Sequence, residues 1–210
     1  MNLLFDLDGT LTDPKPGFDA CVRHAMQALG QPLSPELELE GYIGPPLQDT
    51  FAKLLRDASQ VPRAVELYRE RYTALGMFEN SVYHDIPRVL EALRQQAKLF
   101  VATSKPRVFA EKILAHFELA KHFQAIYGSE LDGTRTDKGE LIGHLLLEQD
   151  LSAAACVMIG DREHDILGAK KHGLHTVGVL WGYGSEQELR RAGAEGVAKE
   201  PGQLLALVEP

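Results

Sequence analysis

From residue 85 onward, short apolar runs alternate with segments of helical periodicity. The alternation predicts a parallel β-sheet with helices on its faces, because parallel strands need long crossovers that are usually helical. A first strand is expected over residues 2–7. The later strands are expected at 98–103, 123–128, 155–160 and 175–180, with helices at 87–96, 106–117, 137–149 and 163–172 and more helices beyond 185.

A long segment without strand periodicity follows the first strand. Apolar residues recur there at helical spacing over 18–29, 47–58 and 62–77. A stretch of about 70 residues is too long for an ordinary connection. We therefore expect an inserted helical domain at 16–81, with 1–15 and 82–210 forming the core domain.

Composition limits the class of protein. The chain has 210 residues, 44% of them apolar, and its 22 basic and 30 acidic residues give a net charge of −8, which argues against a nucleic-acid polymer as partner. Its two cysteines, Cys21 and Cys156, lie far apart, so both are expected to be reduced thiols. Because no apolar run approaches the length of a membrane span, we expect no membrane partner and a cytoplasmic location. The oligomeric state is left open between a monomer and a homodimer.

Two acidic residues, Asp6 and Asp8, directly follow the apolar run Leu3-Leu4-Phe5. Residues two apart on a strand point to the same side, so both carboxylates face one space. They repel each other unless a shared proton or a hard divalent cation neutralises them. The simpler alternative is a turn, since Asp-Gly is a common turn dipeptide.

Two later apolar runs also end in polar residues. The run 99–102 precedes Thr103-Ser104-Lys105, and the run 156–159 precedes Gly160-Asp161 with Asp165 four residues on. Ligands bind at the carboxyl ends of strands in open α/β sheets, so the three strand ends predict one crevice. Local roles remain open, because Thr103 could make an N-cap or turn and the two acids could cap the following helix.

Taken together and in this order, Asp6-Leu7-Asp8-Gly9-Thr10, Thr103, Lys138 and Gly160-Asp161 with Asp165 resemble the four motifs of the haloacid dehalogenase superfamily. The runs 41–47 and 101–106 resemble the phosphoglycolate phosphatase and bacterial 5′-nucleotidase-like branch. The resemblance implies an α/β fold, a Rossmann-like parallel-sheet core with an inserted α-helical cap domain of the C1 type. It covers nearly the whole chain.

The resemblance also implies roles for these residues. Asp6 would be the nucleophile that forms an aspartyl phosphate, and Asp8 the general acid and base, its pKa raised by crowding from a like charge. Mg²⁺ would be the cofactor, held by Asp6, the backbone carbonyl of Asp8, and Asp161, with Asp165 orienting that shell. The predicted phosphate-binding residues are Gly9, Thr10, Thr103, Ser104, Lys105 and Lys138. Lys138 is the first choice for the lysine that neutralises the nucleophile, and Lys105 is its rival.

The predicted function is a Mg²⁺-dependent phosphomonoesterase for small phosphorylated metabolites. Nucleoside 5′-monophosphates are favoured, and the alternatives are phosphoglycolate, a phosphomutase of the same superfamily and a non-catalytic phosphate-binding protein. Thr10 disfavours the mutase, because mutases of this type usually carry valine there. A receiver domain of a response regulator is disfavoured by the order of the motifs and by the long insert.

Two further loops carry open alternatives. Gly44-Pro45-Pro46-Leu47 is either a substrate-contacting loop, as in relatives, or simply a helix start. Trp181-Gly182-Tyr183-Gly184 follows the last predicted strand, where the glycines free the backbone. Packing of its two aromatic rings in the core is expected rather than a place beside the site.

Overall fold

The computed structural model describes residues 1–208, which form two compact units. The first unit joins Met1–Asp13 to the chain from Val82 onward, and the second is Pro14–Ser81. Short strands β2 (Thr12–Asp13) and β3 (Ser81–Val82) pair where the chain passes from one unit to the other.

The first unit is built on a six-stranded sheet in the order β5-β4-β1-β6-β7-β8. All neighbouring strands run parallel. The strands are β1 (Asn2–Phe5), β4 (Lys98–Pro106), β5 (Ala125–Ser129), β6 (Cys156–Gly160), β7 (His175–Val179) and β8 (Gly196–Ala198). Since β1 lies between β4 and β6, its carboxyl end is flanked by the ends of both, at the point where the strand order reverses.

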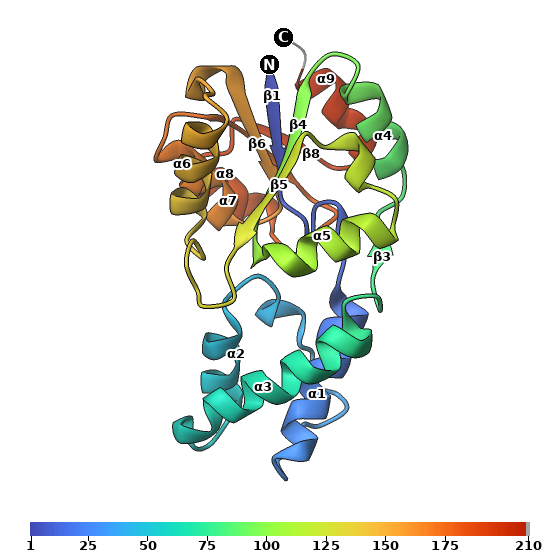
Figure 1. Cartoon of the computed structure of the whole chain (residues 1–210), viewed down its shortest axis with the longest axis vertical. Helices are drawn as coiled ribbons and strands as arrows, with labels where there is room; N and C mark the ends of the chain where they lie inside the picture. Colours follow the sequence, from blue (N-terminus) through green and yellow to red (C-terminus); the bar gives the residue numbers. More distant parts are fainter. Residues whose placement is uncertain (209–210) are drawn as a thin grey trace. The chain divides into compact units, whose positions relative to one another are not determined.

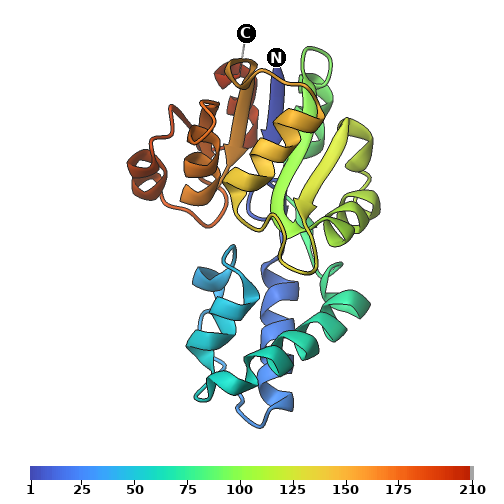
Figure 2. The same ribbon diagram turned by 60° about the vertical axis from the view of Figure 1, so that its left-hand side comes forward.

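Helices cover both faces of this sheet (Figures 1 and 2). One face carries α6 (Lys138–Glu148), α7 (Glu163–Lys170) and α8 (Glu186–Ala192), which contact one another in that order. The other carries α4 (Ile86–Leu93), α5 (Arg107–His116) and the short α9 (Leu204–Leu207). The predicted fold class, a Rossmann-like α/β core, is confirmed.

Strand β1 is buried along its whole length. Leu4 packs with Phe100 of β4 and Met158 of β6 in an apolar cluster that α6 completes through Leu141 and Leu145. A strand covered on both faces reads as a continuous apolar run, as Leu3-Leu4-Phe5 does. The ladder is therefore rigid up to the residue at which the acidic motif begins.

The second unit is helical. It contains α1 (Lys15–Ala28), α2 (Leu47–Leu54) and α3 (Val61–Arg71), the last continuing as a π-helical turn at Tyr72–Gly76. Tyr68 of α3 packs edge-on against Phe18 and Phe51 and stacks on Tyr72. These ring contacts join the three helices in one small core.

The structure differs from the sequence prediction at several element ends. Helix α2 ends at Leu54, four residues before its predicted end, because Leu55 is extended and Asp57 starts a new 3₁₀ turn by accepting from the Ser59 amide. Strand β4 continues past Thr103 to Pro106 through an irregular register with β5. Strand β8 was not predicted at all. The helix start after Pro46 is seen, since α2 begins at Leu47.

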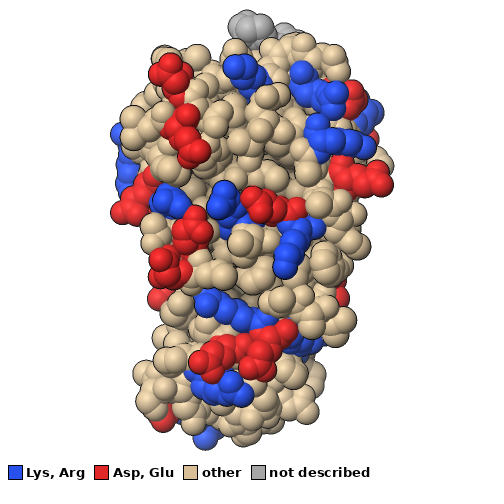
Figure 3. Space-filling model, viewed as in Figure 1, with Lys and Arg blue, Asp and Glu red and all other residues tan. Residues whose placement is uncertain are grey.

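The face of the molecule in Figure 3 offers no simple charge signature. Basic and acidic side chains are interspersed over the face shown in Figure 3. Among the described residues, none of the helices has the length and apolar character needed to cross a bilayer.

Candidate active site

The end of β1 continues into a tight loop that carries both leading acids. The Asp6 amide still belongs to the sheet, donating to the Ile159 carbonyl at 2.9 Å. Beyond it, the amides of Thr10, Leu11 and Thr12 all donate to the Leu7 carbonyl, which closes the loop on itself. Gly9 has a φ of 81°, and a Cβ there would collide with the Asp161 carboxylate. Only glycine satisfies both conditions.

Lys138, at the start of α6, is the lysine beside Asp6. Its Nζ lies 2.9 Å from Asp6 Oδ1 and 2.7 Å from Asp165 Oδ1, and it donates to the Ala102 carbonyl at 2.9 Å. Lys138 is only 5% exposed. Burial by itself lowers its pKa, but Asp165 and Asp6 outweigh burial and leave the pKa raised, so the ammonium stays charged.

Lys105, the predicted rival, pairs with the other acid. Its Nζ lies 2.5 Å from Asp8 Oδ2, while Asp8 Oδ1 is buried and has no hydrogen-bond partner among the described residues. The pKa of Asp8 is raised, chiefly by burial; Lys105 opposes the shift, and the charge of Asp6 adds a smaller part. The pKa of Asp8 is therefore raised as predicted. Its predicted cause, crowding by a like charge, contributes less than desolvation does.

Asp161, at the end of β6, is completely buried, and both of its oxygens are held. Oδ1 accepts from the Thr10 hydroxyl at 3.3 Å, and Oδ2 accepts from the Tyr183 amide at 2.8 Å. Burial, followed by the charges of Asp165 and Asp6, raises its pKa well above the ordinary value. These contacts make Asp161 part of the site rather than a cap of α7.

Asp165, in the first turn of α7, both caps its helix and contacts the site lysine. Its Oδ2 accepts from the Arg162 amide at 3.2 Å, which is the helix-capping alternative, and its Oδ1 contacts Lys138. Burial raises its pKa, with Lys138 acting against the rise. His164, left out of the predicted site, is exposed.

Thr103 and Ser104 lie at the same sheet edge with their hydroxyls in local contacts. Thr103 Oγ1 accepts from the Lys105 amide at 3.3 Å, which is the turn alternative. Ser104 donates to the Thr136 carbonyl at 3.1 Å and accepts through its own carbonyl from the Ser129 hydroxyl. Their predicted contact with phosphate stays a prediction.

One feature that the sequence reasoning missed is the segment after β7. Trp181 and Tyr183 are half-buried, so the expectation that both rings belong to the core is wrong. Trp181 Nε1 donates to the Thr10 carbonyl at 3.0 Å, and the Tyr183 hydroxyl donates to Asp13 Oδ1 at 2.5 Å. The signal in the sequence was a pair of aromatic residues among glycines, each with a polar group, an indole N–H or a hydroxyl, that needs a hydrogen-bond partner when it is partly buried.

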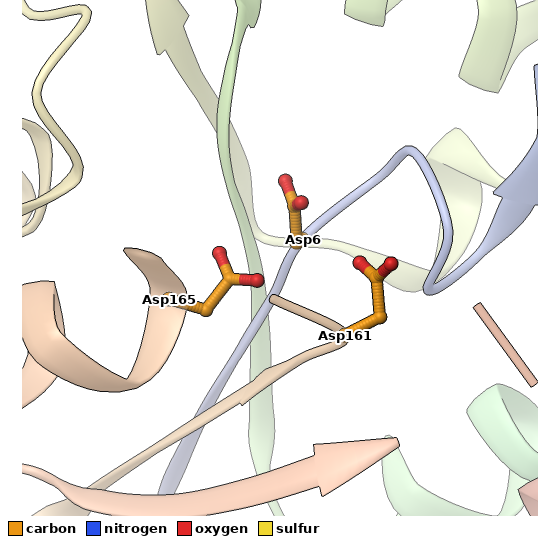
Figure 4. Close-up of side chains that lie close together, drawn as sticks. All are labelled: Asp6, Asp161 and Asp165. Carbon is orange, nitrogen blue, oxygen red and sulfur yellow. The ribbon is translucent and has the colours of Figure 1, made fainter. Parts of the chain in front are cut away.

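The acids form a group suited to a hard cation. Asp6, Asp161 and Asp165 each offer an oxygen, and these oxygens lie within 4.8 Å of one another, from three different elements (Figure 4). With Asp8, four carboxyl groups gather here beside the ammonium groups of Lys105 and Lys138, so the acidic side chains outnumber these two lysines. All-oxygen donors and this charge fit Mg²⁺.

A family comparison decides the class. The sequence model for haloacid dehalogenase-like hydrolases matches residues 3–179. The chain belongs to this family. Its match spans β1 to β7 and therefore every residue of the site described above except Trp181 and Tyr183.

Several of the similar proteins are named as phosphatases. The chain is 52% identical over 191 residues to a 5′-nucleotidase of Pseudomonas aeruginosa, covering 90% of this chain and 86% of that protein. It is 28% identical over 216 residues to a phosphoglycolate phosphatase of Vibrio parahaemolyticus, covering 98% and 95%. The crystal structure of a predicted phosphatase from Clostridium acetobutylicum superposes with a TM-score of 0.92 at 38% identity, covering 99% and 97% of the two chains.

A relative of a different name is also similar. The chain is 40% identical over 184 residues to the tyrosine-protein kinase PtkA of Mycobacterium tuberculosis, covering 87% of this chain but only 62% of that protein. The predicted enzyme class, a phosphatase of the haloacid dehalogenase type, is confirmed by these comparisons as a whole.

Proposed function

We propose that the protein is a Mg²⁺-dependent phosphomonoesterase that works through an aspartyl phosphate on Asp6 and prefers nucleoside 5′-monophosphates. The single observation that carries the proposal is the buried group in which Asp6, Asp161 and Asp165 share one small space with Lys138. A carboxylate held beside an ammonium group at the end of a buried strand is oriented for attack.

Asp6 would attack phosphorus through a carboxylate oxygen, breaking the bond between phosphorus and the ester oxygen. Lys138 neutralises part of the negative charge that gathers as two anions approach. Water would then attack the phosphorus of the aspartyl phosphate, releasing inorganic phosphate and restoring the Asp6 carboxylate.

Asp8 would supply the proton in the first step and recover one in the second. Its raised pKa favours the protonated form that a general acid needs. The ion pair with Lys105 favours the carboxylate. In the proposed mechanism Lys105 would also contact a phosphate oxygen of the substrate. Transfer of Lys105 from Asp8 to the substrate would leave Asp8 free to take up and donate its proton.

The metal site would be made by Asp6 and Asp161, with the Asp8 carbonyl as a further oxygen and Asp165 orienting the shell. When bound, Mg²⁺ supplies positive charge that offsets repulsion between the nucleophile and the phosphate. Thr10 and the Tyr183 amide hold the two Asp161 oxygens in place.

The preference for nucleotides is supported by the 52% identical 5′-nucleotidase. Phosphoglycolate is the alternative, supported by a more distant relative that carries that name. Specificity in this fold depends on residues outside the common motifs, so the Gly44–Leu47 loop as a substrate contact remains a prediction.

The test is phosphate release from a panel of esters by the native protein, by Asp6→Asn and by native protein in EDTA. The panel contains AMP, GMP and IMP, with 3′-AMP as the control for ester position, together with phosphoglycolate and two sugar phosphates. ATP with a tyrosine-containing peptide is added because of the kinase relative.

We expect release that needs Mg²⁺, that ranks 5′-AMP above 3′-AMP, and that Asp6→Asn lowers at least about a thousandfold, as removal of a nucleophile does. If phosphoglycolate is hydrolysed fastest, the protein is a phosphoglycolate phosphatase, the alternative named above. Isomerisation without release would indicate a mutase, and binding without turnover a phosphate-binding protein.

A further inference from the structure

We propose that Trp181 and Tyr183 are positioning residues that hold the Asp8 loop and the Asp161 carboxylate in their reactive arrangement. They belong to a segment, here called the strap and defined as residues 180–184, between β7 and α8. The inference rests on the proposed function, in which Asp8 moves the proton and Asp161 binds the metal.

The strap lies directly against the site. A Cβ on Gly182 would collide with the Gly9 carbonyl and with Asp161, and a Cβ on Gly184 would collide with the Asp161 carbonyl. Neither glycine has a positive φ, so they are not required by backbone conformation. They are required because two backbones approach each other closely, which corrects the expectation that they free the chain.

Trp181 fixes the loop that carries Asp8. Its indole N–H donates to the Thr10 carbonyl, while the Thr10 hydroxyl donates to Asp161. Thr10 is itself fully buried. One hydrogen bond from the strap therefore restrains a residue that contacts Asp161 and lies two positions from Asp8.

Tyr183 makes two contacts at once. Its amide donates to Asp161 Oδ2, and its hydroxyl donates to Asp13 Oδ1. The phenol of Tyr83 also interacts with that of Tyr183. Asp13 closes β2, where the loop from Asp6 ends, so Tyr183 connects the Asp161 carboxylate with the far end of the Asp8 loop.

The Asp8 loop is therefore hydrogen-bonded to Trp181 at Thr10 and to Tyr183 at Asp13. Asp161 accepts hydrogen bonds from both the loop and the strap. Small displacements of reacting groups cost far more in rate than in binding. Loss of a strap contact should therefore reduce turnover and metal affinity more than it weakens binding of substrate.

The experiment compares Trp181→Phe and Tyr183→Phe with the native protein. The first variant keeps an aromatic ring and loses the indole N–H; the second keeps the amide bond to Asp161 and loses the hydroxyl. Tyr127→Phe is the matched control, because Tyr127 also has a hydrogen-bonded hydroxyl in the same unit, accepting from Gln149. The readouts are kcat and KM for the best ester, the Mg²⁺ dissociation constant by calorimetry, and the melting temperature.

We expect each strap variant to lower kcat about tenfold with KM changed less than threefold, and to weaken Mg²⁺ binding about tenfold, the size found for groups that orient metal ligands. Tyr127→Phe should leave both unchanged. Because Trp181 is the single tryptophan of the chain, its emission gives a second Mg²⁺ titration in native protein and in Tyr183→Phe.

Strap variants that melt at lower temperature but keep native kcat and Mg²⁺ affinity would overturn the proposal, since the strap would then be merely structural. If the native protein hydrolyses no ester but binds Mg²⁺, the proposed function fails and the strap is judged on Mg²⁺ affinity alone. In that case, Mg²⁺ affinity equal to that of the native protein in both strap variants would reject the proposal for the strap.

Discussion

Replacing Lys138 by methionine removes the positive charge between Asp6 and Asp165 while keeping most of the side-chain volume. At separations of 2.9 and 2.7 Å, each ion pair is worth about 6 kcal/mol at an effective dielectric constant of about 20. Desolvation of the buried ammonium cancels several kcal/mol of this gain. Removing one partner of buried ion pairs therefore costs about 3–5 kcal/mol in free energy of unfolding.

The loss of unfolding free energy in Lys138→Met should be larger at high pH than at low pH. The pKa of Asp165 is already raised by burial, and removing Lys138 raises it further. A carboxylate with a raised pKa in the folded state contributes stability at low pH and loses that contribution as pH rises through its folded pKa. Lys138→Met should thus be most destabilising near pH 8, and the part of the loss that comes from Asp165 should shrink as pH falls below about 6.

Urea unfolding in EDTA, followed by emission of Trp181 in the first unit, measures this loss. Lys171→Met is the control, because Lys171 pairs with Asp137 at 3.2 Å but is 58% exposed, so its removal should cost no more than about 1 kcal/mol. A Lys138→Met loss as small as that of the control at pH 8 would refute the reasoning. Saturating Mg²⁺ should recover more stability in Lys138→Met than in the native protein, since it replaces the missing charge.

Two further predictions concern the acids. Asp8→Asn should lower kcat/KM, which reports the steps through cleavage of the ester bond, by at least about a hundredfold for AMP but much less for p-nitrophenyl phosphate, whose leaving group departs without a proton; equal losses of kcat/KM for both esters would argue against Asp8 as the acid. The raised pKa values of Asp161 and Asp165 mean that protons compete with Mg²⁺ at unusually high pH, so the Mg²⁺ dissociation constant should rise as pH falls from 8 to 5.5. Calorimetry across this range checks the trend, and a constant affinity would show that neither acid is a ligand.

Much of the core could be predicted because its signals are local. Leu3-Leu4-Phe5 is an apolar run typical of a strand covered on both faces, and the acids follow it within three residues. Strand β8 was missed because it has only three residues, the first of them glycine. The early end of α2 was missed because Asp57 competes for backbone amides through its side chain.

The ion pairs of the site could not be predicted from local sequence signals. Lys138 was preferred over Lys105 as the partner of the nucleophile, and the structure places Lys138 beside Asp6; that Lys105 pairs with Asp8 was not predicted. The raised pKa of Asp8 was expected from its neighbour and is caused mainly by burial. Both outcomes depend on distances and on exclusion of water, which appear only when distant segments meet.

By itself, the sequence determined which apolar runs form the buried strands and which polar residues come with them, because the alternation of apolar runs and helical segments lies in consecutive residues. The tertiary structure alone decided what those residues touch. Parallel strands in the order β4-β1-β6 bring the ends of three segments to one edge, and the strap then reaches back across 171 positions to Thr10. No local pattern encodes such a contact, since its energy depends on where the rest of the chain has packed.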